Sequence, residues 1–142
     1  MASPAFTLDP RLASDSLPLG DWPLCALRLM NDRRFPWLLL IPRRAGLVEL
    51  TDLAENDHGQ LAAEIRAATR LLIDLESPDK TNVATLGNMV AQLHVHVIGR
   101  FHGDAAWPRP VWCVAGARPY GRGELPGLVA RWAAAVAART PG

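Results

Sequence analysis

Residues 92–98 read Gln-Leu-His-Val-His-Val-Ile and place two imidazoles two positions apart between apolar side chains. Successive side chains of a β-strand point to opposite faces of the sheet, so alternate residues share a face. Gln92, His94 and His96 are therefore expected to lie together on one face. The other face of this strand is expected to pack into a core through Leu93, Val95 and Val97.

The chemistry of imidazole makes this pair a candidate site. A neutral imidazole has one nitrogen that donates and one that accepts a hydrogen bond, and it titrates at about pH 6.5. It can attack phosphorus, donate to a phosphate oxygen or bind a metal ion. The chain has 4 histidines among 142 residues, so the spacing alone also fits a chance arrangement of solvated side chains. The flanking residues decide between these interpretations.

The longer segment 87–100 reads Gly-Asn-Met-Val-Ala-Gln-Leu-His-Val-His-Val-Ile-Gly-Arg, and Trp107-Pro108 follows it. This segment resembles the signature of the histidine triad (HIT) hydrolases and transferases of nucleotides, which is His-x-His-x-His followed by two apolar residues. The resemblance implies that His94 is the nucleophile and that His96 serves the phosphate. Gln92 stands in the place of the first histidine of the triad.

Two residues ahead of the histidines also depart from the family pattern. In the family a Gly-Gln-Ser/Thr-Val stretch often precedes the histidines, whereas here Asn88 takes the place of the glutamine and Met89 that of the hydroxyl residue. The nucleophile and its phosphate partner are kept, while one imidazole and one hydroxyl are lost. The resemblance implies substrate contacts from Asn88 and Gln92.

A second match lies upstream, where Met30-Asn31-Asp32 is followed at 37–44 by Trp-Leu-Leu-Leu-Ile-Pro-Arg-Arg. This arrangement is similar to the family's acidic residue near the nucleotide ribose and the apolar strand after it, which ends in Ile-Pro-Lys-Lys. The resemblance implies a substrate-binding role for Asn31 and Asp32. As an alternative, the two residues form only a hairpin turn, because both side chains hydrogen-bond to their own backbone and tolerate unusual dihedral angles.

Hydrophobic periodicity indicates an α+β fold. Runs that are typical of strands include the histidine segment and lie at 24–30, 37–41, 80–86 and 92–98. The first two are expected to form an antiparallel hairpin. Helical periodicity predicts a long helix that begins within 52–57 and ends at Glu76, and a C-terminal helix that begins near Pro126. The resemblance implies a HIT-like fold with a mainly antiparallel sheet, one long central helix and a C-terminal helix.

The domain organisation follows from length and from the distribution of proline and glycine. Residues 1–20 carry three prolines and a glycine among scattered polar residues, so we expect an irregular N-terminal arm. Residues 21–142 are expected to form a single HIT-like domain, because a chain of 142 residues has the commonest single-domain size. Within it, residues 101–120 are rich in proline and glycine and are expected to be irregular.

Charge and hydropathy exclude several function classes. The formal net charge of +1 argues against a nucleic-acid binder, which needs a basic face. The longest apolar run, 132–138, is far shorter than the roughly 18 residues of a membrane span, and the first residues do not look like a signal peptide. We therefore expect a cytoplasmic protein with no membrane partner. Cys25 and Cys113 lie in apolar surroundings and are expected to be buried thiols.

The resemblance further implies a homodimer and a nucleotide as the small-molecule substrate. The segment after the histidine strand would lie near the partner subunit, and Trp107 and Trp112 are candidates for that interface. Plain core packing is the alternative for these two tryptophans, since aromatic side chains bury large areas wherever they pack.

The implied reaction is covalent. For His94 to attack the α-phosphorus of a nucleotide, its Nε2 must be unprotonated, so Nδ1 must carry the hydrogen and donate it to a backbone carbonyl. His96 would donate to a non-bridging oxygen or to the leaving group, with help from Asn88. A nucleotidyl-histidine would form and then be released to water. The scheme needs neither a metal ion nor another cofactor.

Two other classes of function fit the same residues. With altered positions at Gln92, Asn88 and Met89, the protein could be a nucleotide-binding module with weak catalysis. A His-x-His strand pair is also one way in which proteins present metal ligands. Against a metal site, the stretch has no nearby carboxylate or cysteine, and His102 is the only spare imidazole that follows it.

Overall fold

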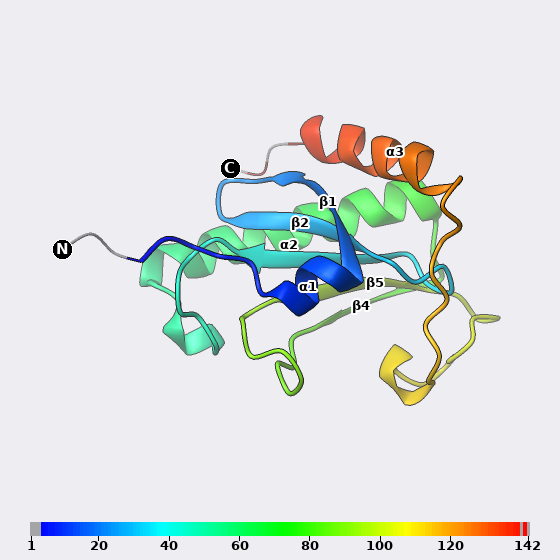
Figure 1. Cartoon of the computed structure of the whole chain (residues 1–142), viewed down its shortest axis with the longest axis horizontal. Coiled ribbons are helices and arrows are strands. Elements are labelled where there is room, and N and C mark those ends of the chain that lie inside the picture. Colours follow the sequence, from blue (N-terminus) through cyan, green and yellow to red (C-terminus); the bar gives the residue numbers. More distant parts are fainter. Residues whose placement is uncertain (1–3, 140, 142) are drawn as a thin grey trace.

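The computed structural model describes residues 4–139 and residue 141, and these form a fold centred on a five-stranded sheet (Figure 1). The sheet is antiparallel and has the strand order β1-β2-β3-β5-β4. In chain order the strands are β1 (Ser16–Asp21), β2 (Cys25–Met30), β3 (Trp37–Pro42), β4 (Lys80–Ala84) and β5 (Val95–Arg100). Strand β5, which contains His96 and begins directly after His94, is called the histidine strand. It lies between β3 and β4, and His96 is paired with Leu39 of β3.

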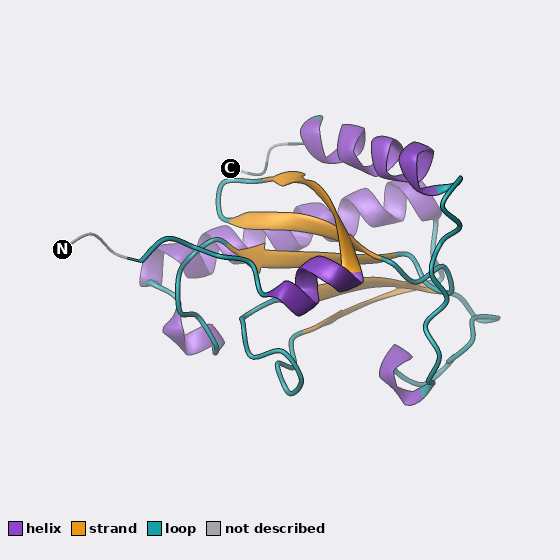
Figure 2. Cartoon of the chain, viewed as in Figure 1, coloured by secondary structure: helices purple, strands orange, loops and turns teal. Residues whose placement is uncertain are grey.

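Within the described residues, three α-helices pack around the sheet (Figure 2). They are α1 (Pro10–Asp15), α2 (Glu55–Glu76) and α3 (Leu125–Ala137), and short 3₁₀ turns are formed by Leu50–Asp52 and Val111–Cys113. In the view of Figure 1, α2 lies behind the sheet and α1 in front of it. None of the helices in the described part of the chain combines the length and the apolar character that crossing a bilayer requires.

A separate hydrophobic core covers each face of the sheet. On the side of α2 and α3, the alternate strand residues pack with both helices, and the cluster includes Leu38, Leu40, Val95, Val97, Leu72 and Trp132. On the side of α1, the other set of strand residues packs with Leu12, and that cluster includes Trp37, Leu39, Ile41 and Ile98. Because both faces are covered, every residue of β3 is buried.

Most of the predicted elements are confirmed. The antiparallel hairpin of β2 and β3 is present, and Leu93, Val95 and Val97 point into the core on the α2 side. Helix α2 ends at Glu76, where Ser77 adopts the left-handed conformation with φ of 48° ahead of Pro78. Strand β4 ends at Ala84 rather than at residue 86. The predicted strand at 92–98 is shifted, since β5 begins at Val95 and ends at Arg100, so Gln92 and His94 precede it.

The expectation that residues 1–20 are irregular is wrong for residues 10–20, while residues 1–3 lie outside the described part. Pro10 stands at the start of α1, where a helix needs no N–H, and the Asp9 side chain caps this helix by accepting from the Arg11 N–H. Pro18 lies in β1, an edge strand, beside an irregularity in the pairing between Pro18 and Gly20. Both prolines therefore occupy positions that regular structure tolerates.

The two cysteines differ from each other. Cys25 is fully buried as expected, and its burial, with the nearby Glu64 carboxylate, raises the pKa of the thiol. The expectation that Cys113 is buried is wrong, since this residue is exposed. In the 3₁₀ turn of Val111–Cys113 it is Val111 that packs into the core, and the thiol at the other end of the turn faces solvent.

Candidate active site

His94 and His96 lie side by side on the face of the sheet that α1 covers. Their ring centroids are 4.8 Å apart, and 6% and 5% of their surfaces are exposed. Both rings line a cavity of about 450 Å³, the histidine cavity, whose walls come from α1, from β2 and β3, and from the loop between β4 and β5. The alternation predicted for this strand thus brings the two imidazoles together at one opening.

The hydrogen bond at Nδ1 fixes the tautomer of His94. Nδ1 lies 2.6 Å from the backbone oxygen of Gln92. A carbonyl oxygen can only accept, so Nδ1 carries the hydrogen and donates it. In the neutral ring, Nε2 then keeps its lone pair.

His96 has the opposite tautomer. The indole Nε1 of Trp37 donates to Nδ1 of His96 over 3.0 Å, and an indole nitrogen can only donate. Nδ1 of His96 therefore carries no hydrogen, and the neutral ring is protonated at Nε2. Burial, with a smaller contribution from the neighbouring His94, lowers the pKa of His96 to about 3. The site accordingly holds one imidazole with a free Nε2 lone pair and one with an Nε2–H donor.

The side chain of Gln92 binds the N-terminal segment instead of lining the histidine cavity. Its Oε1 accepts from the Asp9 N–H at 2.9 Å, and its Nε2 donates to the Thr7 carbonyl at 2.8 Å. The same residue thus holds the segment ahead of α1 through its side chain and orients His94 through its backbone carbonyl. The following helix α1 contributes Leu12 and Asp15 to the cavity wall.

Asn88 and Met89 lie at the histidine cavity. Both belong to the loop between β4 and β5 and line the cavity, and 82% of the Met89 surface is exposed. Gly87 begins this turn with a φ of 74°, a conformation that glycine adopts without strain. The loop therefore forms an open rim beside the two imidazoles.

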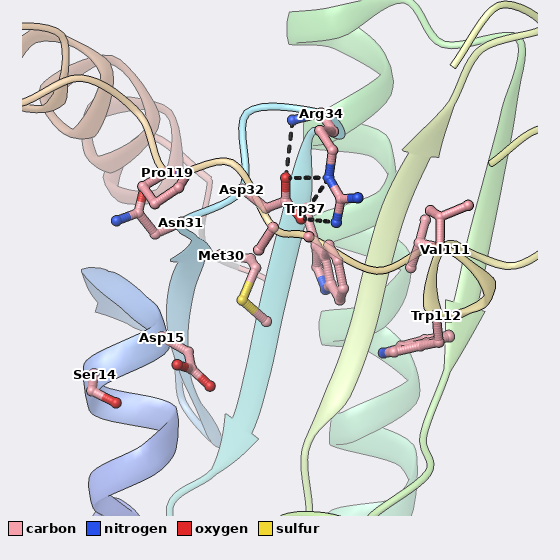
Figure 3. Close-up of a pocket in the computed structure, with 13 residues that line it drawn as sticks. Ser14, Asp15, Met30, Asn31, Asp32, Arg34, Trp37, Val111, Trp112 and Pro119 are labelled. Carbon is pink, nitrogen blue, oxygen red and sulfur yellow. Dashed lines mark hydrogen bonds and ion pairs between the residues drawn. The ribbon is translucent and has the colours of Figure 1, made fainter. Parts of the chain in front are cut away.

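Asn31 and Asp32 line a second cavity of about 440 Å³, the Asn31 cavity, which is next to the first (Figure 3). The two cavities have four lining residues in common, namely Asp15, Met30, Trp37 and Trp112. The Asn31 Oδ1 accepts from the Tyr120 N–H at 2.9 Å. Asn31 thus borders the cavity and also anchors the irregular segment that follows the histidine strand.

The carboxylate of Asp32 is enclosed by protein donors. It is 2% exposed and accepts from Arg34 Nη2 at 2.7 Å, from Arg34 Nε at 2.9 Å and from the Arg118 N–H at 3.3 Å. Burial alone would raise the pKa of Asp32, but these hydrogen bonds outweigh it and hold the pKa below its ordinary value. The turn geometry proposed for Asn31 and Asp32 is therefore present, and it is locked to the segment at Arg118 and Tyr120.

Aromatic residues that sequence reasoning did not assign to the site surround His96. Trp37 and Trp112 lie with their ring centroids 5.6 Å and 4.9 Å from that of His96, both edge to face. Trp112 is 43% exposed and borders both cavities. Its place in a long irregular segment was visible in the sequence, but its contact with His96 depends on how that segment folds back.

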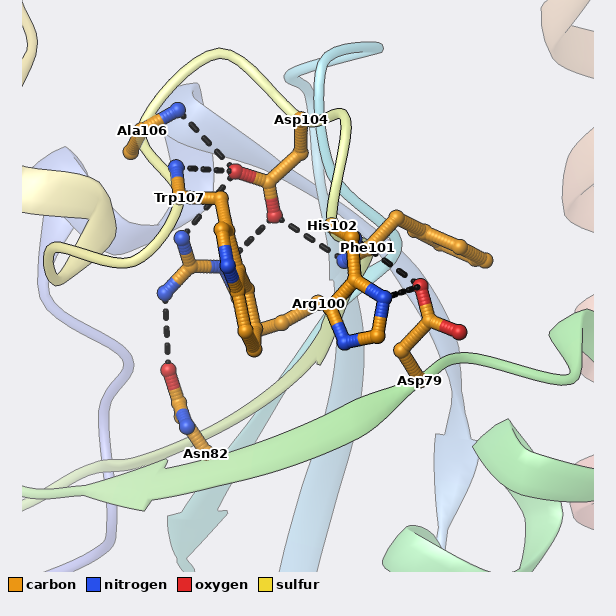
Figure 4. Close-up of polar contacts among 8 residues, drawn as sticks. All are labelled: Asp79, Asn82, Arg100, Phe101, His102, Asp104, Ala106 and Trp107. Carbon is orange, nitrogen blue, oxygen red and sulfur yellow. Dashed lines mark hydrogen bonds and ion pairs between the residues drawn. The ribbon is translucent and has the colours of Figure 1, made fainter.

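A buried ion pair fixes the chain where it leaves β5 (Figure 4). Arg100, 1% exposed, donates from Nε to Asp104 Oδ2 at 2.8 Å and from Nη1 to Asn82 Oδ1 at 2.9 Å. Although burial raises the pKa of Asp104, Arg100 and three backbone N–H groups lower it to about 2. The exposed His102 ring lies against Trp107 in the same loop, with a centroid distance of 4.7 Å. This cluster anchors the start of the segment that leads to Trp112.

The described residues contain no group of three or more His, Cys, Asp or Glu side chains that could hold a metal ion. His94 and His96 therefore have no third protein ligand within that part of the chain. Asp15 is the one acidic residue among those that line the histidine cavity. Sequence reasoning did not select it, because it lies in a segment expected to be irregular.

Comparison with known proteins places this site in a family. The model of the HIT domain matches residues 12–103. A histidine triad protein from Bradyrhizobium japonicum is 44% identical, with a TM-score of 0.86 over 91% of this chain and 96% of that one. One from Sinorhizobium meliloti is 45% identical, with a TM-score of 0.85 over 89% and 94% of the chains. A search of curated proteins found no match.

A third solved structure, a histidine triad protein from Marinobacter aquaeolei, is 39% identical, with a TM-score of 0.90 over 95% of this chain and 98% of that one. These similarities extend well beyond the segment around the histidines. They confirm the HIT-like fold that the sequence predicted. The chain belongs to the histidine triad (HIT) family.

Proposed function

We propose that this protein is a nucleotide hydrolase or nucleotidyl transferase that cleaves a nucleoside monophosphate from a small leaving group through a nucleotidyl-histidine at His94. The observation that carries the proposal is the pair of opposite tautomers in one cavity, with Nδ1–H of His94 on the Gln92 carbonyl and Nδ1 of His96 on the Trp37 indole. One ring is then ready to attack and the other to donate.

In the first step, the Nε2 lone pair of His94 attacks the α-phosphorus. The bond from phosphorus to the leaving group breaks, and the leaving group departs with the electron pair. His96 donates its Nε2–H to a non-bridging oxygen or to the leaving group, where negative charge develops. The ring of His94 becomes positively charged in the adduct, and the Gln92 carbonyl at Nδ1 stabilises that charge.

In the second step, water attacks the phosphorus of the adduct and releases one proton to solvent. The phosphorus–nitrogen bond breaks, and its electron pair returns to Nε2 of His94. A nucleoside monophosphate is the product. Asn88, on the rim of the cavity, is proposed to donate to a phosphate oxygen through its amide. Asn31 is proposed to face the nucleoside, and Asp32 to hold the turn through Arg34. No step in this scheme uses a metal ion.

We also propose that the protein is a homodimer in the cytoplasm. Strand β4 lies at the edge of the described sheet. Val83 within it is 48% exposed, and Leu86 just after it is 50% exposed. An edge strand with exposed apolar side chains favours pairing with another chain. Family membership supports the same arrangement.

Trapping the intermediate tests the proposed chemistry. The protein is incubated with adenosine 5′-phosphoramidate labelled in the phosphate, quenched in a denaturant at high pH, and digested for mass spectrometry. We expect an acid-labile adenylate on His94 that is absent from the His94→Asn variant, while His58→Asn, an exposed change on α2, leaves it in place. An adduct on another residue overturns the mechanism. Nucleotide binding with no turnover and no adduct favours a binding module instead.

A further inference from the structure

We infer that Asp15 recognises the ribose hydroxyls of the bound nucleotide. This inference rests on the proposed function and names the side chain that selects a ribonucleotide. Asp15 is the last residue of α1, it is exposed, and it lines both the histidine cavity and the Asn31 cavity.

The order of groups in a nucleotide places the sugar at the boundary between the cavities. The phosphate must lie beside His94 and His96, which line only the histidine cavity. The base then occupies the Asn31 cavity, and the sugar joins the two. The charged, hydroxyl and amide side chains that line the Asn31 cavity are those of Ser14, Asp15, Asn31, Asp32 and Arg34. Of these, only Asp15 also lines the histidine cavity.

The carboxylate of Asp15 has the chemistry that a vicinal diol requires. An ionised carboxylate is acceptor-only and has two oxygens, so it can accept from both hydroxyls of a ribose ring. In Figure 3 its side chain extends from the end of α1 toward Met30, and the hydrogen bonds drawn there reach Asp32 but not Asp15. Among the residues drawn, the oxygens of Asp15 remain open to a ligand.

Asp32 is less suited to this task. Its carboxylate is 2% exposed, and Arg34 engages it from two nitrogens at 2.7 Å and 2.9 Å. Using it for a hydroxyl would require breaking a hydrogen-bonded ion pair that is almost free of solvent. Resemblance assigns the contact with the ribose to the turn at Asn31 and Asp32. Asp15, at the end of α1, is better suited to make this contact.

The fold holds Asp15 firmly enough for recognition. The backbone oxygen of Asp15 accepts from the Asn31 N–H at 2.9 Å, which ties the end of α1 to the end of β2. At the other end of α1, Gln92 binds the backbone of Thr7 and Asp9. Between these points, Leu12 is buried in the core on the α1 side. Both ends of the short helix are thus fixed relative to the histidine strand.

The experiment compares ribose and deoxyribose ligands in the intact protein and in Asp15→Asn. Affinities for adenosine, 2′-deoxyadenosine and 3′-deoxyadenosine 5′-monophosphate are measured by calorimetry. We expect removal of either hydroxyl to weaken binding to the parent protein by about tenfold or more, as loss of a hydrogen bond to a charged group does. In Asp15→Asn the ribonucleotide should bind as weakly as the deoxynucleotides do, so that the ratio falls close to one.

Two further variants complete the test. Asp15→Glu keeps the charge but moves it by one methylene, so part of the discrimination should remain. Asp21→Asn removes an exposed carboxylate at the other end of β1, beside Arg43, and should leave discrimination unchanged. Thermal unfolding of each variant checks that the fold is intact.

Several results would overturn the inference. If Asp15→Asn binds all three nucleotides more tightly by the same factor, the carboxylate only repels the phosphate. If the ratio of ribose to deoxyribose affinity stays as in the parent, or if only base preference changes, another group reads the sugar. If the parent protein binds none of the three nucleotides, the proposed function fails together with the inference, and this result is distinct from the others.

Discussion

The indole Nε1 of Trp37 and Nδ1 of His96 are joined by a hydrogen bond of 3.0 Å in which the indole is the donor. The two residues are 59 positions apart and lie on neighbouring strands, β3 and β5. This bond determines which nitrogen of His96 remains protonated, and therefore what the ring can offer a phosphate.

Imidazole tautomers can be measured directly by ¹⁵N NMR. When both rings are neutral, we expect His94 to be the Nδ1–H form, because Nδ1 donates to the Gln92 carbonyl. We expect His96 to be the Nε2–H form, because its Nδ1 accepts from the Trp37 indole. Trp37→Phe should release His96 to a mixture of forms. Trp112→Phe, which changes an aromatic neighbour without a hydrogen bond to Nδ1, is the matched control. Detection of His96 in the Nδ1–H form in the parent would contradict the assignment.

The lowered pKa of His96 links stability to pH. In the folded protein the pKa is about 3 rather than 6.5, so between these values the unfolded chain binds more protons. The contribution of His96 is therefore complete above about pH 6.5 and is lost as the pH falls. Relative to His96→Asn, the parent should lose about 2 to 3 kcal/mol of unfolding free energy between pH 7 and pH 4.5. Urea denaturation at both pH values measures this difference, and a constant difference would argue against it.

Kinetics should separate the roles of the two histidines. His94→Asn removes the atom that forms the phosphorus–nitrogen bond, so turnover should fall by orders of magnitude while nucleotide binding largely survives. His96→Asn removes one donor to a developing charge and should cost about tenfold to a thousandfold. Single-turnover rates and calorimetry provide the two readouts. A His94 variant as fast as the parent would refute the mechanism.

Gln92→His tests what the first position of the triad does here. Because the Gln92 backbone carbonyl, not its side chain, contacts His94, we expect activity and nucleotide affinity to stay within about tenfold of the parent, or about 1.4 kcal/mol. Complete loss of activity in a folded variant would reveal a contact of the amide with the substrate.

Gln92→Ala should act on stability instead. It removes the two hydrogen bonds to Thr7 and Asp9, so the free energy of unfolding should fall by about 1 to 3 kcal/mol. Hydrogen exchange should increase at the Asp9 amide. Gln92→Glu keeps the acceptor and loses the donor, so the free energy of unfolding should fall by an intermediate amount. Equal stability of the parent, Gln92→Ala and Gln92→Glu would show that the two hydrogen bonds to Thr7 and Asp9 contribute nothing.

The oligomeric state is the simplest measurement. Light scattering at micromolar concentration should give a mass near twice 15.4 kDa. Val83→Glu, which places a charge within the edge strand β4, should shift the protein toward the monomer. A monomeric parent protein would contradict the proposed homodimer. If the dimer persists in Val83→Glu, the interface lies elsewhere, for instance at Trp107.

Local patterns allowed much of this fold to be predicted. Alternation around His94 and His96 identified the strand and its two faces, because that pattern depends on residues next to one another. Its bounds were not predicted, since β5 begins at Val95 and ends at Arg100. The C-terminal end of α2 followed similarly from Ser77 and Pro78. Proline in 1–20 misled the prediction, since Pro10 and Pro18 occupy the few positions at which regular structure accepts proline.

Contacts between distant segments were not available from the sequence. Nothing near His96 indicates that Trp37 will set its tautomer, and nothing near Gln92 indicates that its amide will meet Thr7 and Asp9. Asp32 is a further example of contacts between distant segments. Its place in the motif was recognised, but its enclosure by Arg34 and Arg118 depends on how the segment after β5 returns to the turn.

The side chain of Gln92 binds residues that lie ahead of the region matched by the family model. The family model begins to match at residue 12, yet the wall of the histidine cavity is tied down at Thr7 and Asp9. A protein trimmed to residues 12–103 would keep every histidine but would lose Thr7, Asp9 and the first two residues of α1. Thr7 and Asp9 therefore belong to the support of the histidine cavity, and a bulky group fused close to them is expected to disturb the position of α1.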